Sequence, residues 1–134
     1  MQSKSYEREQ YELVTLTLDS ILTTIQNLIE WNKNIKFADE YYDSPSGMQL
    51  LAANCTLITA IGEGINRINR VMPGFLSSNF PDVPWQDIVG MRNRIAHGYF
   101  ELDADIILDA IKNDIPILED VIRKAIKLID YEIC

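Results

Sequence analysis

Apolar residues recur in steps of three and four along most of this 134-residue chain. Steps of three and four place side chains on one face of an α-helix, whereas a half-buried strand needs strict alternation. The first such stripe lies between about Glu7 and Phe37 and predicts a long amphipathic helix. Its apolar members are Tyr11, Val14, Leu18, Ile21, Leu22, Ile25, Leu28 and Ile29.

The same spacing predicts a second helix from about Met48 to Val71. The intervening stretch from Asp39 to Gly47 is rich in Asp, Ser, Pro and Gly, which predicts a loop. Phe75 to Phe80 is expected to form a short helical turn. A further helix is expected from about Pro84 to His97, with the fixed φ of Pro84 in its first turn and Gly98 ending it.

Asp103 is a good N-cap for a helix that carries Ile106, Ile107 and Ile111. Asp114 and Pro116 then predict either a kink or a break and restart, because proline removes a helical hydrogen bond. The apolar pattern resumes after Pro116, and no strand pattern appears in the sequence. We therefore expect one all-α domain over residues 1–134, an antiparallel up-and-down bundle of four or five helices.

Three residues of the second helix depart from its apolar pattern. Asn54 interrupts the stripe and is either a hydrogen-bonded core amide or a polar support that reaches toward a site. Gly62 and Gly64 each cost about 1 kcal/mol relative to alanine in a helix, which predicts close approach of another helix there. Cys55 is expected to be a small buried apolar residue.

Composition excludes several classes of protein. No apolar run approaches the roughly 20 residues of a membrane span, and residues 1–12 are too polar for a signal peptide, so we expect a cytoplasmic protein without a membrane partner. The two cysteines, Cys55 and Cys134, suggest neither a disulfide framework nor a zinc site. No metal or cofactor is expected.

The side chains best suited to catalysis or phosphate binding lie at the end of the helix expected over residues 84–97. Asn93 lies one turn before His97, the single histidine, and Arg92 is long enough to reach the same space. Arginine makes bidentate contacts with phosphate, and histidine moves protons near neutral pH. Such a set suits a phosphate substrate, although a lone histidine also commonly caps a helix, and spacing alone does not separate the two interpretations.

The net charge of −8 argues against a nucleic-acid partner, but the charge is unevenly distributed. Residues 61–100 contain four arginines and three carboxylates, a local charge of +1, which leaves −9 for the rest of the chain. Besides Arg92, the arginines are Arg67, Arg70 and Arg94, and they are candidates for binding RNA phosphates. Arg67 and Arg70 are equally well explained as a solvated helix face.

Four separated blocks carry a resemblance to a known family. They are Pro81-Asp82-Val83-Pro84-Trp85, Ile88-Val89-Gly90-Met91-Arg92-Asn93, His97-Gly98-Tyr99-Phe100 and Asn113-Asp114-Ile115-Pro116-Ile117-Leu118. In this order they resemble the HepT-like branch of the HEPN superfamily. Its signature Arg-x4-His-x-Tyr falls on Arg92, His97 and Tyr99, and Ile61-Gly62-Glu63-Gly64 resembles the family's Ile-Gly-Glu-Ala segment, with glycine in place of alanine.

The resemblance implies an all-helical toxin that cleaves RNA without a metal ion, using the 2′-hydroxyl as the internal nucleophile. Arg92 and His97 would be catalytic, with His97 as general acid or base and Arg92 stabilising charge on the phosphorane. Asn93 and Glu63 would support them. No carboxylate cluster accompanies the motif, so a two-metal mechanism is not indicated.

The resemblance also implies two partners. One is a second copy of the chain, since one histidine cannot readily serve as both acid and base and a homodimer would place two motifs at a shared cleft. The other is a minimal nucleotidyltransferase of the MntA type, an antitoxin that would AMPylate Tyr99. The added phosphate and bulk would block the site. Tyr99 could equally be a packing residue at a helix end.

A second hypothesis belongs to another functional class. A HEPN-like bundle could bind a nucleotide, or serve as a scaffold for a nucleotidyltransferase, without turnover. In that case Arg92 and His97 would hold phosphate and catalyse nothing. The acidic charge favours this alternative, whereas the unbroken set of Arg92, His97 and Tyr99 favours the ribonuclease.

Overall fold

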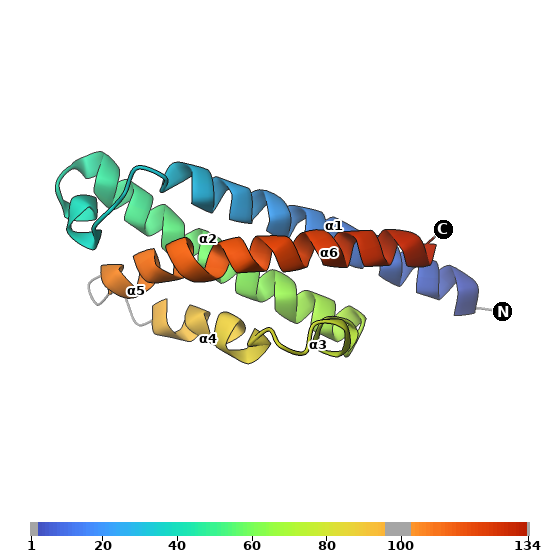
Figure 1. Cartoon of the computed structure of the whole chain (residues 1–134). Coiled ribbons are helices and arrows are strands. Elements are labelled where there is room, and N and C mark those ends of the chain that lie inside the picture. The colour runs from blue at the N-terminus through green and yellow to red at the C-terminus, as the bar shows by residue number, and fades with distance from the viewer. Residues whose placement is uncertain (1–2, 96–102, 134) are drawn as a thin grey trace.

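The fold is all-α, as expected, in a computed structural model that describes the backbone of residues 3–95 and 103–133 and the side chains of residues 6–91 and 103–131 (Figure 1). Every regular element in these ranges is helical. The elements are α1 (Ser3–Trp31), η1 (Ala38–Tyr42), α2 (Pro45–Val71), α3 (Phe75–Asn79), α4 (Trp85–Ile95), α5 (Ala104–Asp109), η3 (Ala110–Asp114) and α6 (Ile115–Ile133).

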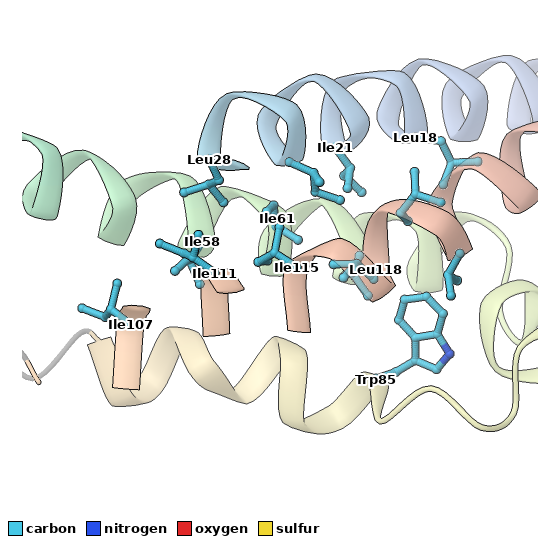
Figure 2. Packing of buried hydrophobic residues seen from close by; sticks show 14 of the residues in the cluster. Leu18, Ile21, Leu28, Ile58, Ile61, Trp85, Ile107, Ile111, Ile115 and Leu118 are labelled. Atoms are coloured by element: carbon cyan, nitrogen blue, oxygen red, sulfur yellow. The ribbon is translucent and has the colours of Figure 1, made fainter. Parts of the chain in front are cut away.

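The long helices pack side by side around one core. α1 lies against both α2 and α6, and α2 also lies against α4. Figure 1 shows α6 in orange and red alongside α1, with α4 in yellow beneath. Residues of the predicted stripes fill the space between them, as Leu18, Ile21, Leu28, Ile58 and Ile61 show in Figure 2. The bundle therefore buries the faces that the apolar spacing predicts.

The first helix ends at Trp31, six residues earlier than expected. Asn32 is fully buried, and its side-chain amide donates to the carbonyl of Leu28 at 2.8 Å, which satisfies a carbonyl in the last turn. The chain is extended again at Phe37, with φ of −130° and ψ of 143°. Polar side chains that bond the backbone at the helix end thus override the apolar pattern beyond Trp31.

The prediction of a loop from Asp39 to Gly47 is wrong in part. Its first half forms the short helix η1, because the Glu40 carboxylate accepts backbone N–H groups of Lys36 and Phe37 at 2.6 and 3.2 Å. These two hydrogen bonds hold the pKa of Glu40 below its usual value, and the bond from Lys36 makes the larger contribution. Its second half is already α2.

The start of α2 lies three residues before the expected Met48. The Ser44 hydroxyl accepts the N–H of Gly47 at 3.0 Å, and Pro45 occupies the first turn. Both are standard start signals of a helix, so the residues that predict a loop by composition act here as an N-terminal cap.

Asn54 is a hydrogen-bonded core amide, the first of the two roles open to it. Asn32, Tyr41 and Asn54 are all fully buried. Asn32 and Asn54 exchange side-chain hydrogen bonds of 2.8 and 2.9 Å, and the Tyr41 hydroxyl donates to Oδ1 of Asn32 at 2.7 Å. Lys112 Nζ donates to the Asn32 carbonyl at 2.9 Å. The network joins α1, η1, α2 and η3 at one end of the bundle.

Close approach of another helix is confirmed at Gly64. A Cβ added there would lie 2.9 Å from Cγ1 of Ile21, in α1. Gly62 is buried as well. By length and composition alone, α2 is apolar enough to cross a membrane, the one such helix among the described residues, with a mean hydropathy of 1.2. A core helix passes the same criterion, and α2 packs against α1 and α4.

The segment around Pro116 does not break and restart as a new helix. α5, η3 and α6 follow one another without a gap, and η3 is a π-helical turn in which the N–H of Ile115 donates to the carbonyl of Ala110. In a regular α-helix the ring of Pro116 would collide with the carbonyl of Lys112. The wider turn accommodates the proline while the chain remains helical.

Candidate functional site

The helix that carries the motif is anchored at its N-terminal end. Trp85 is buried, and its indole Nε1 donates to the carbonyl of Phe80 at 3.0 Å. The carbonyl of Pro84 accepts the N–H groups of Asp87 and Ile88, which closes the first turn of the helix. α4 therefore begins where the sequence predicts, and its described part extends to Ile95.

The middle of α4 is fixed by apolar contacts. Ile88 and Met91 face Ile58 and Ile61 of α2 across a small cavity of about 20 Å³. Position 92 follows directly and lies one turn beyond Ile88 in the helix. The backbone that presents the motif is thus held on the α2 side of the bundle.

The chemistry-bearing part of the motif lies outside the described residues. This applies to His97, Gly98 and Tyr99 as a whole and to the side chains of residues 92–94. The convergence of Arg92, Asn93, Arg94 and His97 stays a prediction. So does the end of the helix at Gly98.

The other candidate residues, Glu63, Arg67 and Arg70, lie on α2 and not on the motif helix α4. They line a groove between α2 and α1, opposite Leu13 and Leu16. α4 packs on another side of α2, through Ile58 and Ile61. Among the described residues, Glu63 forms no ion pair with an arginine, so its expected support of the site stays a prediction.

The sequence analysis missed one acidic residue beside the motif helix. Asp114 lines the same small cavity as Ile88 and Met91, and it is the charged member of an otherwise apolar lining. Asp114 is exposed, and part of the residue lies beside the turn that leads into Arg92. The available signal was the position of Asp114 seven residues after Ile107 and four before Leu118, both buried, in the apolar stripe.

Cys55 is half-buried rather than fully buried, and burial raises the pKa of its thiol. It lines a shallow hollow on α2 with Thr56, Thr59, Ala60 and Glu63. Within residues 3–95 and 103–133 no group of three His, Cys, Asp or Glu side chains is placed to hold a metal ion.

Comparison with known proteins identifies a family for the chain. The family described as "Ribonuclease HepT-like" matches residues 2–125. A "Putative RNase" of Caldanaerobacter subterraneus subsp. tengcongensis is 31% identical over 110 residues, covering 82% of this chain and 91% of the relative. A "Putative RNase" of Methanocaldococcus jannaschii is 30% identical over 99 residues, covering 74% and 84%.

A third relative carries the family name itself. The "Probable ribonuclease HepT" of Thermococcus cleftensis is 27% identical over 107 residues, covering 80% of this chain and 90% of the relative. No solved structure matches the chain significantly. The matched span includes every element from α1 to the middle of α6 and the whole Arg92-to-Tyr99 motif, and the relatives support a function of the ribonuclease type. The chain belongs to the HepT-like ribonuclease family.

Proposed function

We propose that this chain is a metal-independent endoribonuclease that acts as a cytoplasmic toxin. The observation that carries the proposal is the unbroken set of Arg92, His97 and Tyr99 in a chain that matches the HepT-like family over residues 2–125. The firm packing of α4 against α2 supports it, because a catalytic group needs a rigid element behind it.

In the proposed reaction the RNA supplies its own nucleophile. The ribose 2′-oxygen attacks the adjacent phosphorus, its proton passes to a general base, and the P–O5′ bond breaks as a general acid protonates the leaving 5′-oxygen. The products are a 2′,3′-cyclic phosphate and a 5′-hydroxyl. His97 of one copy serves as base and His97 of a second copy as acid, across a cleft shared by a homodimer.

The remaining motif residues bind charge. Arg92 stabilises the phosphorane with a bidentate contact, and Asn93 orients His97 or binds phosphate. Arg94 adds a contact to the RNA backbone. Glu63 keeps the supporting role that the family resemblance implies, from the groove between α1 and α2 rather than from the side of α2 that packs on α4.

Tyr99 is the proposed point of control. A partner nucleotidyltransferase transfers AMP from ATP to its phenolic oxygen, and pyrophosphate leaves. The modification places a negative phosphate beside Arg92 and His97, where the substrate phosphate would otherwise bind. The nucleotidyltransferase is then the antitoxin, and this chain is its substrate.

The test is cleavage of total RNA in EDTA by protein expressed without a nucleotidyltransferase, with intact mass confirming that Tyr99 is unmodified. We expect cleavage with cyclic phosphate ends, and its loss in His97→Ala with secondary structure retained. A His97→Ala protein that cleaves as fast as the parent overturns the catalytic assignment. AMP mass on Tyr99 after co-expression, absent in Tyr99→Phe, tests the control step.

A non-catalytic module that binds nucleotide or a nucleotidyltransferase is the second candidate. The net charge of −8 favours it, because an acidic surface repels RNA. Unmodified protein that binds a nucleotide or a nucleotidyltransferase and leaves RNA intact would establish this candidate.

A further inference from the structure

A groove of about 530 Å³ runs between α1 and α2, here called the α1–α2 groove, and none of its described lining residues belongs to the motif helix α4. The lining extends from Leu13 to Thr24 on α1 and from Ala60 to Arg70 on α2. At about 1.5 Å per residue, each wall is roughly 15 Å long. The groove is therefore long enough to hold about three turns of another helix.

The α1 wall of the groove has an apolar edge. Leu13 and Leu16 line the groove and are 36% and 65% exposed. They lie one turn apart on α1, so their side chains form one continuous edge. Large apolar side chains exposed along a groove indicate a surface that another molecule covers.

The floor of the groove is low at its centre. Ala60 and Gly64 lie one turn apart on α2 and both line the groove. A Cβ added at Gly64 would lie 2.9 Å from Cγ1 of Ile21 and 3.6 Å from Cγ2 of Thr17, so α1 and α2 are in close contact there. Since small side chains shorten the distance at which helices pack, a third helix can approach this floor closely.

The α2 wall carries two cations. Arg67 and Arg70 are exposed, lie one turn apart and line the groove. Across the described residues, neither forms an ion pair. Glu63 is the only carboxylate among the described lining residues, so the wall keeps a net positive charge. Negatively charged groups on an occupant would complement it.

The apolar edge and the two cations face each other across the groove. α1 and α2 run antiparallel (Figure 1), and Gly64 is level with the stretch between Thr17 and Ile21. Arg67, three residues after Gly64, is therefore level with Leu16. The second arginine and the second leucine face each other one turn further along. An occupant thus meets apolar side chains on one side and cations on the other within the same two turns.

The lining favours a protein occupant over RNA. Among the described residues, none that lines the groove is aromatic, whereas proteins hold single-stranded RNA largely by aromatic side chains that stack on its bases. The hydroxyls of Thr17 and Thr24 donate to the carbonyls of Leu13 and Ser20 at 2.9 and 2.8 Å, so they have no hydrogen left to donate to a phosphate. A groove with an apolar edge is instead suited to the apolar face of an amphipathic helix.

We propose that the α1–α2 groove binds an amphipathic helix of another protein, about three turns long, with carboxylates beside its apolar stripe. The apolar stripe packs on Leu13 and Leu16, and the carboxylates pair with Arg67 and Arg70. This binding is independent of the proposed ribonuclease activity, because the motif helix α4 packs on another side of α2.

The first test uses two synthetic helical peptides of about 14 residues. Both carry the same leucine stripe, and they differ only in having two glutamates or two lysines beside it. Fluorescence anisotropy should show that the glutamate peptide binds the parent protein about tenfold more tightly than the lysine peptide. Arg67→Glu/Arg70→Glu should reverse this order. Equal binding of the two peptides by the parent, or an unchanged order in the variant, overturns the proposal.

The second test compares two leucine-sized sites of equal exposure. Leu16 and Ile117 are both 65% exposed, but Ile117 lies on α6, which contributes no described residue to the groove. We expect Leu16→Glu to weaken binding of the glutamate peptide about tenfold and Ile117→Glu to leave it unchanged. Equal effects of the two variants overturn the proposal. His97→Ala should bind the peptide as the parent does, which separates this result from a failure of the ribonuclease.

Two further outcomes would assign the groove to another occupant. Sedimentation velocity with saturating glutamate peptide should leave the oligomeric state of the parent unchanged, whereas a peptide that dissociates a homodimer would place a second copy in the groove. A single-stranded RNA oligonucleotide that displaces the peptide from the His97→Ala protein would place RNA there. Either result overturns the proposal.

Discussion

At the scale of single residues, the buried amide pair of Asn32 and Asn54 sets the geometry of one end of the bundle. Each amide supplies a donor and an acceptor, and the Tyr41 hydroxyl bonds both residues. Buried polar groups are costly unless they are paired, so this network tolerates only one relative placement of α1, η1 and α2. Sequence spacing identified Asn54 as exceptional but gave no indication of its partners, which lie 22 and 13 residues away.

Tyr41 makes the stability of the fold sensitive to high pH. Burial raises the pKa of its hydroxyl to about 12, whereas an unfolded tyrosine titrates near 10. The native state therefore keeps a proton that the unfolded state loses. We expect the contribution of Tyr41 to be fully present below about pH 10 and to be lost as the pH rises toward 12.

Urea unfolding from pH 8 to 11.5 tests this expectation against Tyr41→Phe. The variant should lose about 1 to 2 kcal/mol at pH 8, because it lacks the hydrogen bond to Asn32. Its stability should then fall less steeply than that of the parent above pH 10. Parallel pH profiles would contradict the assignment.

Gly64 and Gly90 should respond in opposite directions to alanine. A Cβ at Gly64 meets Ile21 at 2.9 Å, so Gly64→Ala should destabilise the fold by about 1 to 3 kcal/mol through overpacking. A Cβ at Gly90 meets no atom of the described residues within 4 Å, so Gly90→Ala should stabilise by about 0.5 to 1 kcal/mol through helix propensity. Chemical denaturation at low protein concentration measures both. A Gly64→Ala variant as stable as Gly90→Ala would refute close helix contact.

At the scale of elements, α5 depends on its cap. The Asp103 carboxylate accepts the N–H groups of Asp105 and Ile106 at 3.0 and 3.2 Å, as the sequence predicts. α5 is only six residues long and continues through η3 into α6. A helix this short has little intrinsic stability, so its first turn relies on the cap and on the buried Ile107 and Leu108.

Asp103→Ala should lower the free energy of unfolding by about 0.5 to 2 kcal/mol. Asp103→Asn should retain most of the stability that the cap contributes, since asparagine caps as well as aspartate. Thermal and chemical denaturation compare the two. Equal losses for both variants would show that charge, rather than the cap hydrogen bonds, carries the effect.

At the scale of the whole molecule, the salt dependence of RNA binding can show which arginines of this acidic protein contact phosphate. Each phosphate contact to single-stranded RNA contributes about 0.7 to the slope of log affinity against log salt. The structure puts Arg67 and Arg70 in the groove between α1 and α2, whereas Arg94 lies on α4.

Arg67→Ala/Arg70→Ala should therefore leave the salt slope of RNA binding by the His97→Ala protein nearly unchanged, whereas Arg94→Ala should reduce it. Fluorescence anisotropy with a labelled oligonucleotide, from low to moderate salt, gives both slopes. A loss of about 1.4 in the slope of the double variant would mean that Arg67 and Arg70 bind phosphate after all.

The sequence by itself determined the helical class, the approximate helices, the cap at Asp103 and the order of the motif, because these follow from spacing and chemistry between residues a few positions apart. The sequence left Asp114 and Pro116 open between a kink and a break, and the structure excludes the break, because the chain stays helical there through a π-turn. Only the tertiary structure decided that Asn32 and Tyr41 bond Asn54, that Asp114 lies beside the motif helix, and that Glu63 shares a groove with Leu16. These relations depend on how the helices rotate and slide against one another, and that is fixed by packing of distant side chains rather than by any local pattern.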